Sequence, residues 1–235
     1  MTMTDRGVVF IGAHPDDLAA VAGTLVLLRA EGYRLHDVCL TRGEKGCARE
    51  PGADVVAVRR REEEAACALL GAELTMFAEP DGALYAHREI CERVAARLAE
   101  WKPAAVITHW PLEKPDHAAA FGIAHKALHL AGLYFTTDFY LADLFGQGDN
   151  FRPDLYVNTS AVIEPATAVA RCYRNQWTDT AAERTVPQAR ALGRVAWCEY
   201  AEGFATALPL MGARWNRPGE AGRVLLGLGG VAKGD

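Results

Sequence analysis

Short apolar runs alternate with longer amphipathic segments over the first 131 positions of the chain. The short runs have the length of buried strands, whereas the longer segments repeat apolar residues every three or four positions, as a helix does. The pattern predicts strands at 7–13, 34–41, 73–78 and 104–110. It predicts helices at about 16–31, 56–70, 87–101 and 116–131.

This alternation is typical of βαβ units, which build a parallel sheet with helices on both faces. The pattern is weaker beyond residue 131, where we predict a strand at 154–160 and helices at 166–176 and 187–199. Pro187 would occupy the first helical position, where proline is tolerated. We therefore predict one α/β domain over 1–235, a Rossmann-like three-layer sandwich with a mostly parallel sheet and a loosely held tail from about 216.

Composition narrows the function classes. The net charge is -5, 23% of the residues are charged, and no basic run is present, so nucleic acid is not an expected partner. No segment reaches the roughly 18 apolar residues that would cross a bilayer, and the first residues lack the pattern of a signal peptide. We expect a cytoplasmic protein that does not bind membranes. The six cysteines include no C-x-x-C pair, which favours free thiols.

Polar residues follow the first predicted strand directly, in the stretch "AHPDD". In open α/β sheets, ligands bind outside the carboxyl ends of the strands. Pro15 keeps His14 extended and fixes a sharp turn, so His14 and Asp17 can reach one point. An aspartate at a helix start is often only a cap, and this reading suits Asp16 or Asp17 taken alone. It does not explain His14.

The fourth predicted strand ends in the same way, with His109 at its end and Asp116 and His117 at the start of the next helix. The carboxyl ends of parallel strands share one edge of the sheet. Two distant loops therefore bring histidines and aspartates together. His14, Asp17 and His117 form a two-histidine, one-carboxylate set, which suits a catalytic Zn²⁺ with open positions.

Two common classes of α/β protein are unsupported. A dinucleotide-binding protein needs a Gly-rich turn after the first strand, but "GAHPDD" places bulk and negative charge there. A serine hydrolase of this architecture needs a G-x-S-x-G elbow, and the chain has none.

With these motifs in place, the sequence resembles the zinc-dependent N-acetylglucosaminyl deacetylases, the LmbE-like or PIG-L-type family that includes the mycothiol and bacillithiol pathway deacetylases. The matches keep the family's order and cover roughly the first 205 residues. They are "AHPDD", "TRGEKG", Arg59 with Glu62 before "LLG", "PDG", "PDH" and "YAEGF".

The resemblance implies a role for each matched residue. His14, Asp17 and His117 would hold Zn²⁺, or another divalent cation such as Fe²⁺. Asp16 would be the general base that takes a proton from the bound water and passes it to the leaving amine. Asp116 would orient a neighbouring group. Arg59 and Asp81 would bind the sugar, and the rest of the run "RRREEEAA" is interpreted as a solvated helix face. Similar proteins are often trimers or hexamers, so the resemblance also implies a homo-oligomer.

The chain departs from the family at one position. The family commonly has His-Pro-Asp-His where this sequence has Lys114-Pro115-Asp116-His117. The first histidine of that motif helps to stabilise the charged intermediate. Lys114 can supply positive charge near a developing oxyanion, but it is longer and more strongly hydrated. His109 is a candidate to share this role at the substrate.

We therefore predict a metal-dependent hydrolase that removes an N-acetyl or short N-acyl group from an amino sugar or amino-sugar conjugate. Two alternatives remain open. One is an amidase of the same fold that acts on a non-sugar metabolite, and the departure at Lys114 is the reason to consider it. The other is a non-catalytic metal-binding module, against which Asp16 argues because binding alone needs no base.

Overall fold

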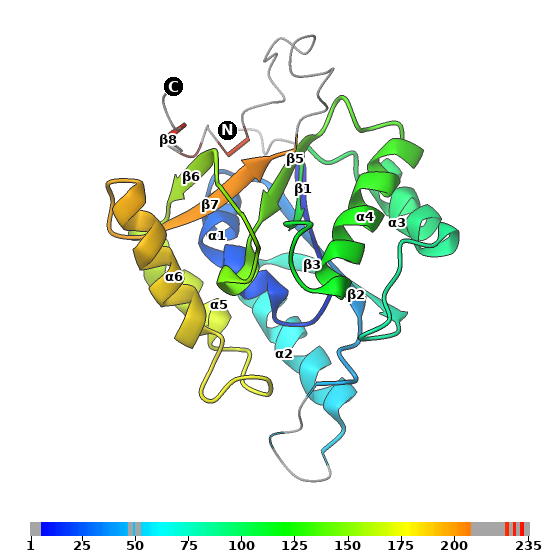
Figure 1. Ribbon diagram of the computed structural model, residues 1–235, viewed down its shortest axis with the longest axis horizontal. Coiled ribbons are helices and arrows are strands. Elements are labelled where there is room, and N and C mark those ends of the chain that lie inside the picture. The colour runs from blue at the N-terminus through cyan, green and yellow to red at the C-terminus, as the bar shows by residue number, and fades with distance from the viewer. Residues whose placement is uncertain are drawn as a thin grey trace.

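The computed structural model describes residues 6–46, 49, 53–207, 224–225, 228 and 231–232. Its centre is an eight-stranded sheet with the order β3-β2-β1-β4-β5-β7-β6-β8 (Figure 1). Strands β1 to β5 pair in parallel, and β7 runs antiparallel to β5 and β6. The strands are β1 Gly7–Gly12, β2 Arg34–Thr41, β3 Ala72–Glu79, β4 Ala105–His109, β5 Asp138–Ala142, β6 Leu155–Asn158, β7 Ala201–Thr206 and β8 Val231–Ala232.

Helices cover both faces of this sheet, which confirms the predicted three-layer α/β sandwich with a mostly parallel sheet. One hydrophobic core lies between the sheet and α1, α2 and α5, and a second lies between the sheet and α3 and α4. The α-helices are α1 Ala22–Ala30, α2 Val55–Leu70, α3 Arg88–Trp101, α4 Pro115–Leu130, α5 Ile163–Ala170 and α6 Ala182–Val195. The 3₁₀ helices are η1 Asp17–Val21, η2 Leu144–Gly146 and η3 Ser160–Val162.

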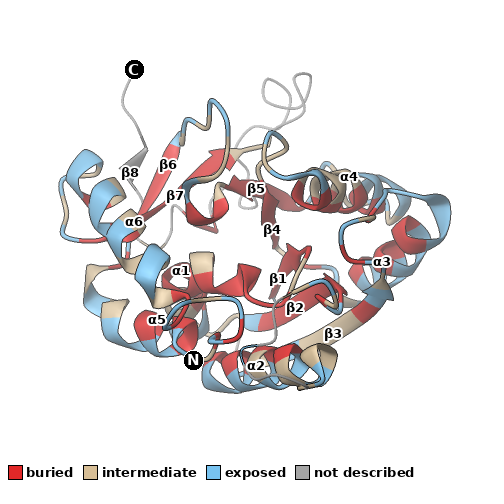
Figure 2. Cartoon of the chain, turned by 60° about the horizontal axis from the view of Figure 1, so that its bottom comes forward, coloured by how far each residue is buried: buried red, intermediate tan, exposed pale blue. Residues whose placement is uncertain are grey.

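Strand β1 shows why this sequence forms a central strand. Val8 and Phe10 belong to one core and Val9 and Ile11 to the other, because successive side chains point to opposite faces. A strand covered by helices on both sides must be apolar along its whole length. Figure 2 shows this burial in the central strands β1, β4 and β5, in contrast to the exposed outer faces of the helices. Along this segment, polar side chains can therefore lie only where β1 ends, after Gly12.

The predicted helix at 16–31 is divided in the structure. It begins as the 3₁₀ helix η1, and α1 starts only at Ala22. The reason is a carboxylate from the other end of the chain. Glu202 on β7 accepts hydrogen bonds from the backbone N–H groups of Gly23 (2.7 Å) and Thr24 (2.8 Å). These are donors that the first turn of a helix leaves without partners.

The two late helix predictions were wrong in their bounds. The helix predicted at 166–176 is α5, Ile163–Ala170. It ends early because the N–H groups of Arg174 and Asn175 bond to Glu62 instead of to a helical carbonyl. The helix predicted from Pro187 begins five residues earlier, at Ala182, so the proline lies inside α6. Strands β5 and β7 were not predicted at all.

Several sequence expectations concern residues near the ends of the chain or in its loops. The tail predicted from about 216 lies largely outside the described residues. The sixth cysteine of the sequence, Cys47, also lies outside them, whereas the five described cysteines are free thiols, as expected. Among the described residues, we find no helix that is long and apolar enough to span a bilayer.

Candidate metal centre and active site

The turn after β1 holds three polar side chains in a fixed arrangement. The backbone N–H of His14 donates to Oδ2 of Asp17 at 2.8 Å, which closes the turn. Asp16 has a φ of 105°, a left-handed conformation that is rare for residues other than glycine. Its backbone N–H donates to Oε2 of the buried Glu63 at 3.0 Å. This contact from α2 holds Asp16 in a conformation that it would not adopt alone.

The start of α4 brings His117 to this turn. The rings of His14 and His117 lie 5.3 Å apart between centroids. Asp17 lies between them, with Oδ1 3.6 Å from Nε2 of His117 and Oδ2 3.7 Å from Nδ1 of His14. One ligand atom from each of the three residues lies within 4.8 Å of the other two. The two loops thus meet at one point, as the sequence predicts.

Glu113 orients His117, and sequence reasoning missed it. Its Oε2 lies 2.5 Å from Nδ1 of His117 and 3.2 Å from Nδ1 of His109. Its Oε1 accepts the N–H of Leu144 at 2.8 Å. Because Glu113 accepts a proton of His117 at Nδ1, the lone pair of Nε2 faces Asp17. Carboxylate–histidine pairs of this kind orient metal ligands in many proteins.

His14 is oriented by two other carboxylates. Its Nε2 lies 3.2 Å from Oδ2 of Asp116 and 3.3 Å from Oδ1 of Asp81, which leaves Nδ1 directed toward Asp17. Burial alone lowers the pKa of His14, but the bonds to Asp116 and Asp81 outweigh it and raise the pKa to about 10. Asp116 also accepts the N–H of Gly82 at 2.6 Å. The contact with His14 is the arrangement expected of a residue that orients a neighbour.

His109 lies behind the ligand set. Its side chain is fully buried, with Nε2 3.2 Å from Oδ2 of Asp17 and Nδ1 facing Glu113. Burial lowers the pKa of His109, but Asp17 and Glu113 raise it above the ordinary value. Burial likewise raises the pKa of Asp17, and the nearby His117 and His109 bring it below its ordinary value. Its position places His109 with the residues that support the ligands, and not on the cavity, where we predicted a substrate contact.

The carboxylate of Asp16 lies between a cation and an indole. Arg59 donates from Nη2 to Oδ1 of Asp16 at 3.0 Å, and Trp177 donates from Nε1 to Oδ2 at 3.1 Å. Burial raises the pKa of Asp16 most, Arg59 lowers it and Asp17 raises it, with a net value of about 6. A carboxylate with such a pKa is ionised near neutral pH and is still basic enough to accept a proton.

Arg59 and Glu63 both lie inside the protein, although α2 carries the run of charges. Arg59 also donates to the carbonyl oxygens of Pro15 and Gly43, so it ties the loops after β1 and β2 to each other. The interpretation of the remaining run as a solvated face was wrong for Glu63, which is 1% exposed. Burial and the neighbouring Asp37 raise the pKa of Glu63 well above its ordinary value.

A cavity of about 590 Å³ opens over these residues. His14, Asp17 and His117 line it together with Asp16. Arg59 and Asp81, the predicted sugar-binding residues, line it as well. Lys114 is the N-cap of α4, and it also faces this cavity. The rest of the wall comes from Lys45, Gly46, Phe145, Gln147, Gln176, Trp177 and Arg184.

The chemistry of the ligand set fits a divalent transition metal. Two imidazoles with their other nitrogens bonded to carboxylates, plus one aspartate, are a donor set typical of catalytic zinc and of non-haem iron(II). The pKa of His117 is lowered, by burial and by His109, which keeps its ring neutral as a ligand must be. The pKa of His14 is raised instead, so binding of a cation there would release the proton of its ring.

Comparison with known proteins gives relatives over nearly the whole chain. The 4-oxalmesaconate hydratase of Pseudomonas putida is 26% identical over 247 residues, covering 89% of this chain and 92% of the hydratase. The conserved protein TT1542 of Thermus thermophilus is 29% identical with a TM-score of 0.73, covering 90% of this chain and 99% of its own.

A deacetylase shares the fold at lower identity. The N,N'-diacetylchitobiose deacetylase of Pyrococcus horikoshii superposes with a TM-score of 0.75 at 22% identity, covering 90% of this chain and 86% of its own. The family model for GlcNAc-PI de-N-acetylase, PIG-L, matches residues 9–128. This match spans more than half of the sequence and includes both loops that meet at Asp17. The chain therefore belongs to the PIG-L family.

Proposed function

We propose that this protein is a metal-dependent hydrolase that removes an N-acetyl or short N-acyl group from an amino sugar or its conjugate. The observation that carries the proposal is Asp16, a buried and unusually basic carboxylate beside a complete ligand set. A module that only bound metal would have no use for this group. Membership of the PIG-L family supports the same conclusion.

A divalent cation held by His14, Asp17 and His117 would supply Lewis acidity, which makes water more acidic and an amide carbonyl more electrophilic. Asp16 then accepts the proton of the attacking water. When the C–N bond breaks, Asp16 returns that proton to the nitrogen, so the products are a carboxylate and a free amine. Arg59 and Trp177 hold Asp16 in place during both transfers.

Lys114 is the group that we propose for the developing oxyanion. It lies at the start of α4 and lines the cavity that Asp16 also lines. Its ammonium group can stabilise negative charge, but it has more freedom than the histidine that is usual in the family.

Hydration is a second candidate, and one observation favours it. The relative that covers 89% of this chain at 26% identity is a hydratase, so this scaffold also supports addition of water without loss of an amine. Both reactions require activated water, and both would use Asp16 as the base. They differ in the substrate that the cavity accepts.

The test is a screen of the zinc-loaded protein against a panel of N-acetylated amino sugars, with release of acetate and of free amine both measured. We expect equal amounts of the two products from at least one sugar. The Asp16→Asn variant should bind the same amount of zinc and release neither product. Full activity of this variant would show that Asp16 is not the base. No release from any sugar by the native protein would reject the sugar deacetylase and leave hydration as the function to test.

A further inference from the structure

Three cations on the wall of the cavity have no anionic partner among the residues that the structure describes. They are Lys45, Lys114 and Arg184, and all three side chains belong to exposed residues that line the cavity. Within that described part of the chain, none of the three has a carboxylate within 4.0 Å. Arg59 differs, because Asp16 already pairs with it at 3.0 Å.

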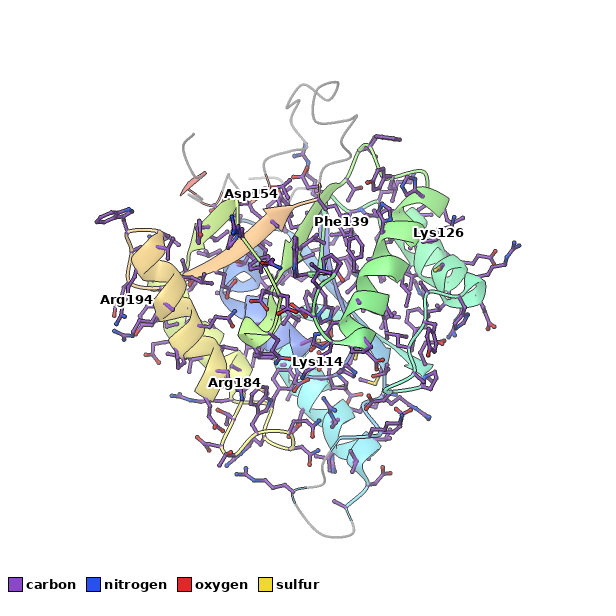
Figure 3. All side chains as sticks on the ribbon, viewed as in Figure 1. Lys114, Lys126, Phe139, Asp154, Arg184 and Arg194 are labelled. Carbon is purple, nitrogen blue, oxygen red and sulfur yellow. The ribbon has the colours of Figure 1, made fainter. Side chains whose placement is uncertain are left out.

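The three cations come from separate elements that converge on the cavity. Lys45 lies in the loop after β2, Lys114 precedes α4 and Arg184 lies in the first turn of α6. Figure 3 labels Lys114 and Arg184 at the ends of their helices that lie toward the cavity. The guanidinium group of Arg184 lies 5.9 Å from the centre of the Trp177 ring, a contact that helps to orient it.

The carboxylates of the cavity cannot neutralise this charge, because each is already engaged. Asp16 pairs with Arg59, Asp81 lies against His14, and Asp17 belongs to the ligand set. A divalent cation would add further positive charge. The cavity is therefore electropositive away from the ligand set, and such a field attracts anions.

We propose that Lys45 and Arg184 bind a carboxylate group of the substrate, with Lys114 left for the reacting carbonyl, so that this enzyme acts on an acidic molecule and not on a neutral sugar. The inference rests on the proposed function, since it concerns the same cavity. The planar fork of an arginine matches a carboxylate or a phosphate, so the helix starts at the cavity decide between them. A phosphate is more often held by backbone N–H groups at a helix start, and α4 has Pro115 there, which has no N–H to donate.

Binding of an unreactive probe tests this proposal without relying on turnover. The zinc-loaded protein is titrated with glutarate and with glutaramide, its neutral analogue, by calorimetry at low salt. We expect glutarate to bind, glutaramide to bind at least about tenfold more weakly, and added salt to weaken glutarate binding. Arg184→Gln and Lys45→Gln should each raise the Kd for glutarate by about tenfold.

Two control variants carry the same loss of charge at positions away from the cavity. Lys126→Gln lies on α4 and Arg194→Gln on α6, and neither residue lines the cavity (Figure 3). Both should bind glutarate as the native protein does. Equal weakening by the controls would attribute the effect to net charge and overturn the proposal. Glutarate binding that Arg184→Gln and Lys45→Gln leave unchanged would show that the metal alone holds the probe, and would also overturn it. Tighter binding of inorganic phosphate than of glutarate would also overturn the proposal.

A second comparison separates this inference from the proposed function. N-acetylmuramic acid is N-acetylglucosamine with a lactic acid ether at O3, so the pair differs by a carboxylate and the short linker that carries it. We expect a lower KM for the acid, and an increase of that KM in Arg184→Gln. Equal KM values for the two sugars would reject carboxylate recognition and keep the deacetylase. Glutarate binding through Lys45 and Arg184, without amine release from either sugar, would keep carboxylate recognition and reject the deacetylase.

Discussion

The indole of Trp177 donates a hydrogen bond to Asp16 at 3.1 Å, although 161 positions separate the two residues. Asp16 belongs to the turn after the first strand, whereas Trp177 lies in the loop between α5 and α6. The orientation of the proposed base therefore depends on a loop from the second half of the chain, outside the part that matches the family model.

We expect Trp177→Phe to reduce activity by roughly tenfold at pH 6, since a hydrogen bond to a charged group contributes about 1.5 kcal/mol or more. The indole favours the ionised form of Asp16, so its loss raises the pKa of that carboxyl. The base must be ionised to act, and the acid limb of the profile of kcat/KM should move to higher pH. Trp110→Phe is the control, because its indole bonds instead to the carbonyl of Asp149. An unshifted acid limb in Trp177→Phe would mean that the indole does not set the basicity of Asp16.

Glu113→Gln should lower the affinity for metal by about 10- to 100-fold, as loss of a ligand-orienting carboxylate does in other proteins. A glutamine has one acceptor oxygen and no charge, so it cannot both receive the Nδ1 protons of His109 and His117 and accept the N–H of Leu144. Competition with a chromophoric chelator measures the affinity. The exposed Glu100→Gln should behave as the native protein does. Native affinity in Glu113→Gln would exclude Glu113 from this role.

His117→Ala should abolish stoichiometric zinc binding, because it removes one of the three proposed ligands. Elemental analysis after dialysis checks this prediction. His125→Ala is a matched control on the same helix, since the ring of His125 contacts Tyr134 and Phe139 instead of the ligand set. One zinc per chain in His117→Ala would remove this residue from the site.

The raised pKa of Glu202 predicts that the stability of the protein depends on pH. Burial raises the pKa of this carboxyl from 4.5 to about 7, against the opposing effect of its bonds to Thr24 and Gly23. Between these pH values the folded protein keeps a proton that the unfolded chain has lost. Glu202 therefore adds most to the free energy of unfolding below pH 4.5. This contribution falls by about 3 kcal/mol as the pH rises to 7, and it is constant at higher pH.

Urea unfolding of the native protein and of Glu202→Gln, at pH 5 and pH 8, isolates this effect from other titrating groups. We expect the free energy of unfolding of the native protein to exceed that of the variant by more at pH 5 than at pH 8. The same difference at both pH values would show that the folded pKa of Glu202 is not raised.

The sequence predicted the first four strands and the meeting of His14, Asp17 and His117 because both depend on strong local signals. A strand that is buried on both faces must be apolar, so a histidine or aspartate directly after it is easy to detect. The carboxyl ends of parallel strands then determine which loops lie together. Neither step needs knowledge of the second half of the chain.

The supporting residues were missed because their environment is set by distant contacts. Glu63 lies in a charged run that is typical of a solvated helix face, and only the fold shows that it holds the strained N–H of Asp16. Glu113 had a usable signal, since it is four residues from both His109 and His117. The start of α1 depends on Glu202, which is 179 positions from Gly23, and no local pattern reveals this bond.

The wall of the cavity comes from two stretches of the chain, one that carries the proposed ligands and one that carries none of them. All three proposed ligands lie between positions 14 and 117, whereas Phe145, Gln147, Trp177 and Arg184 form a later part of the wall. A mutant library confined to Phe145, Gln147 and Arg184 would leave the ligands and the indole that bonds to Asp16 in place while it reshapes this wall. The scaffold thus offers protein engineers a way to retarget the enzyme without rebuilding its reactive centre.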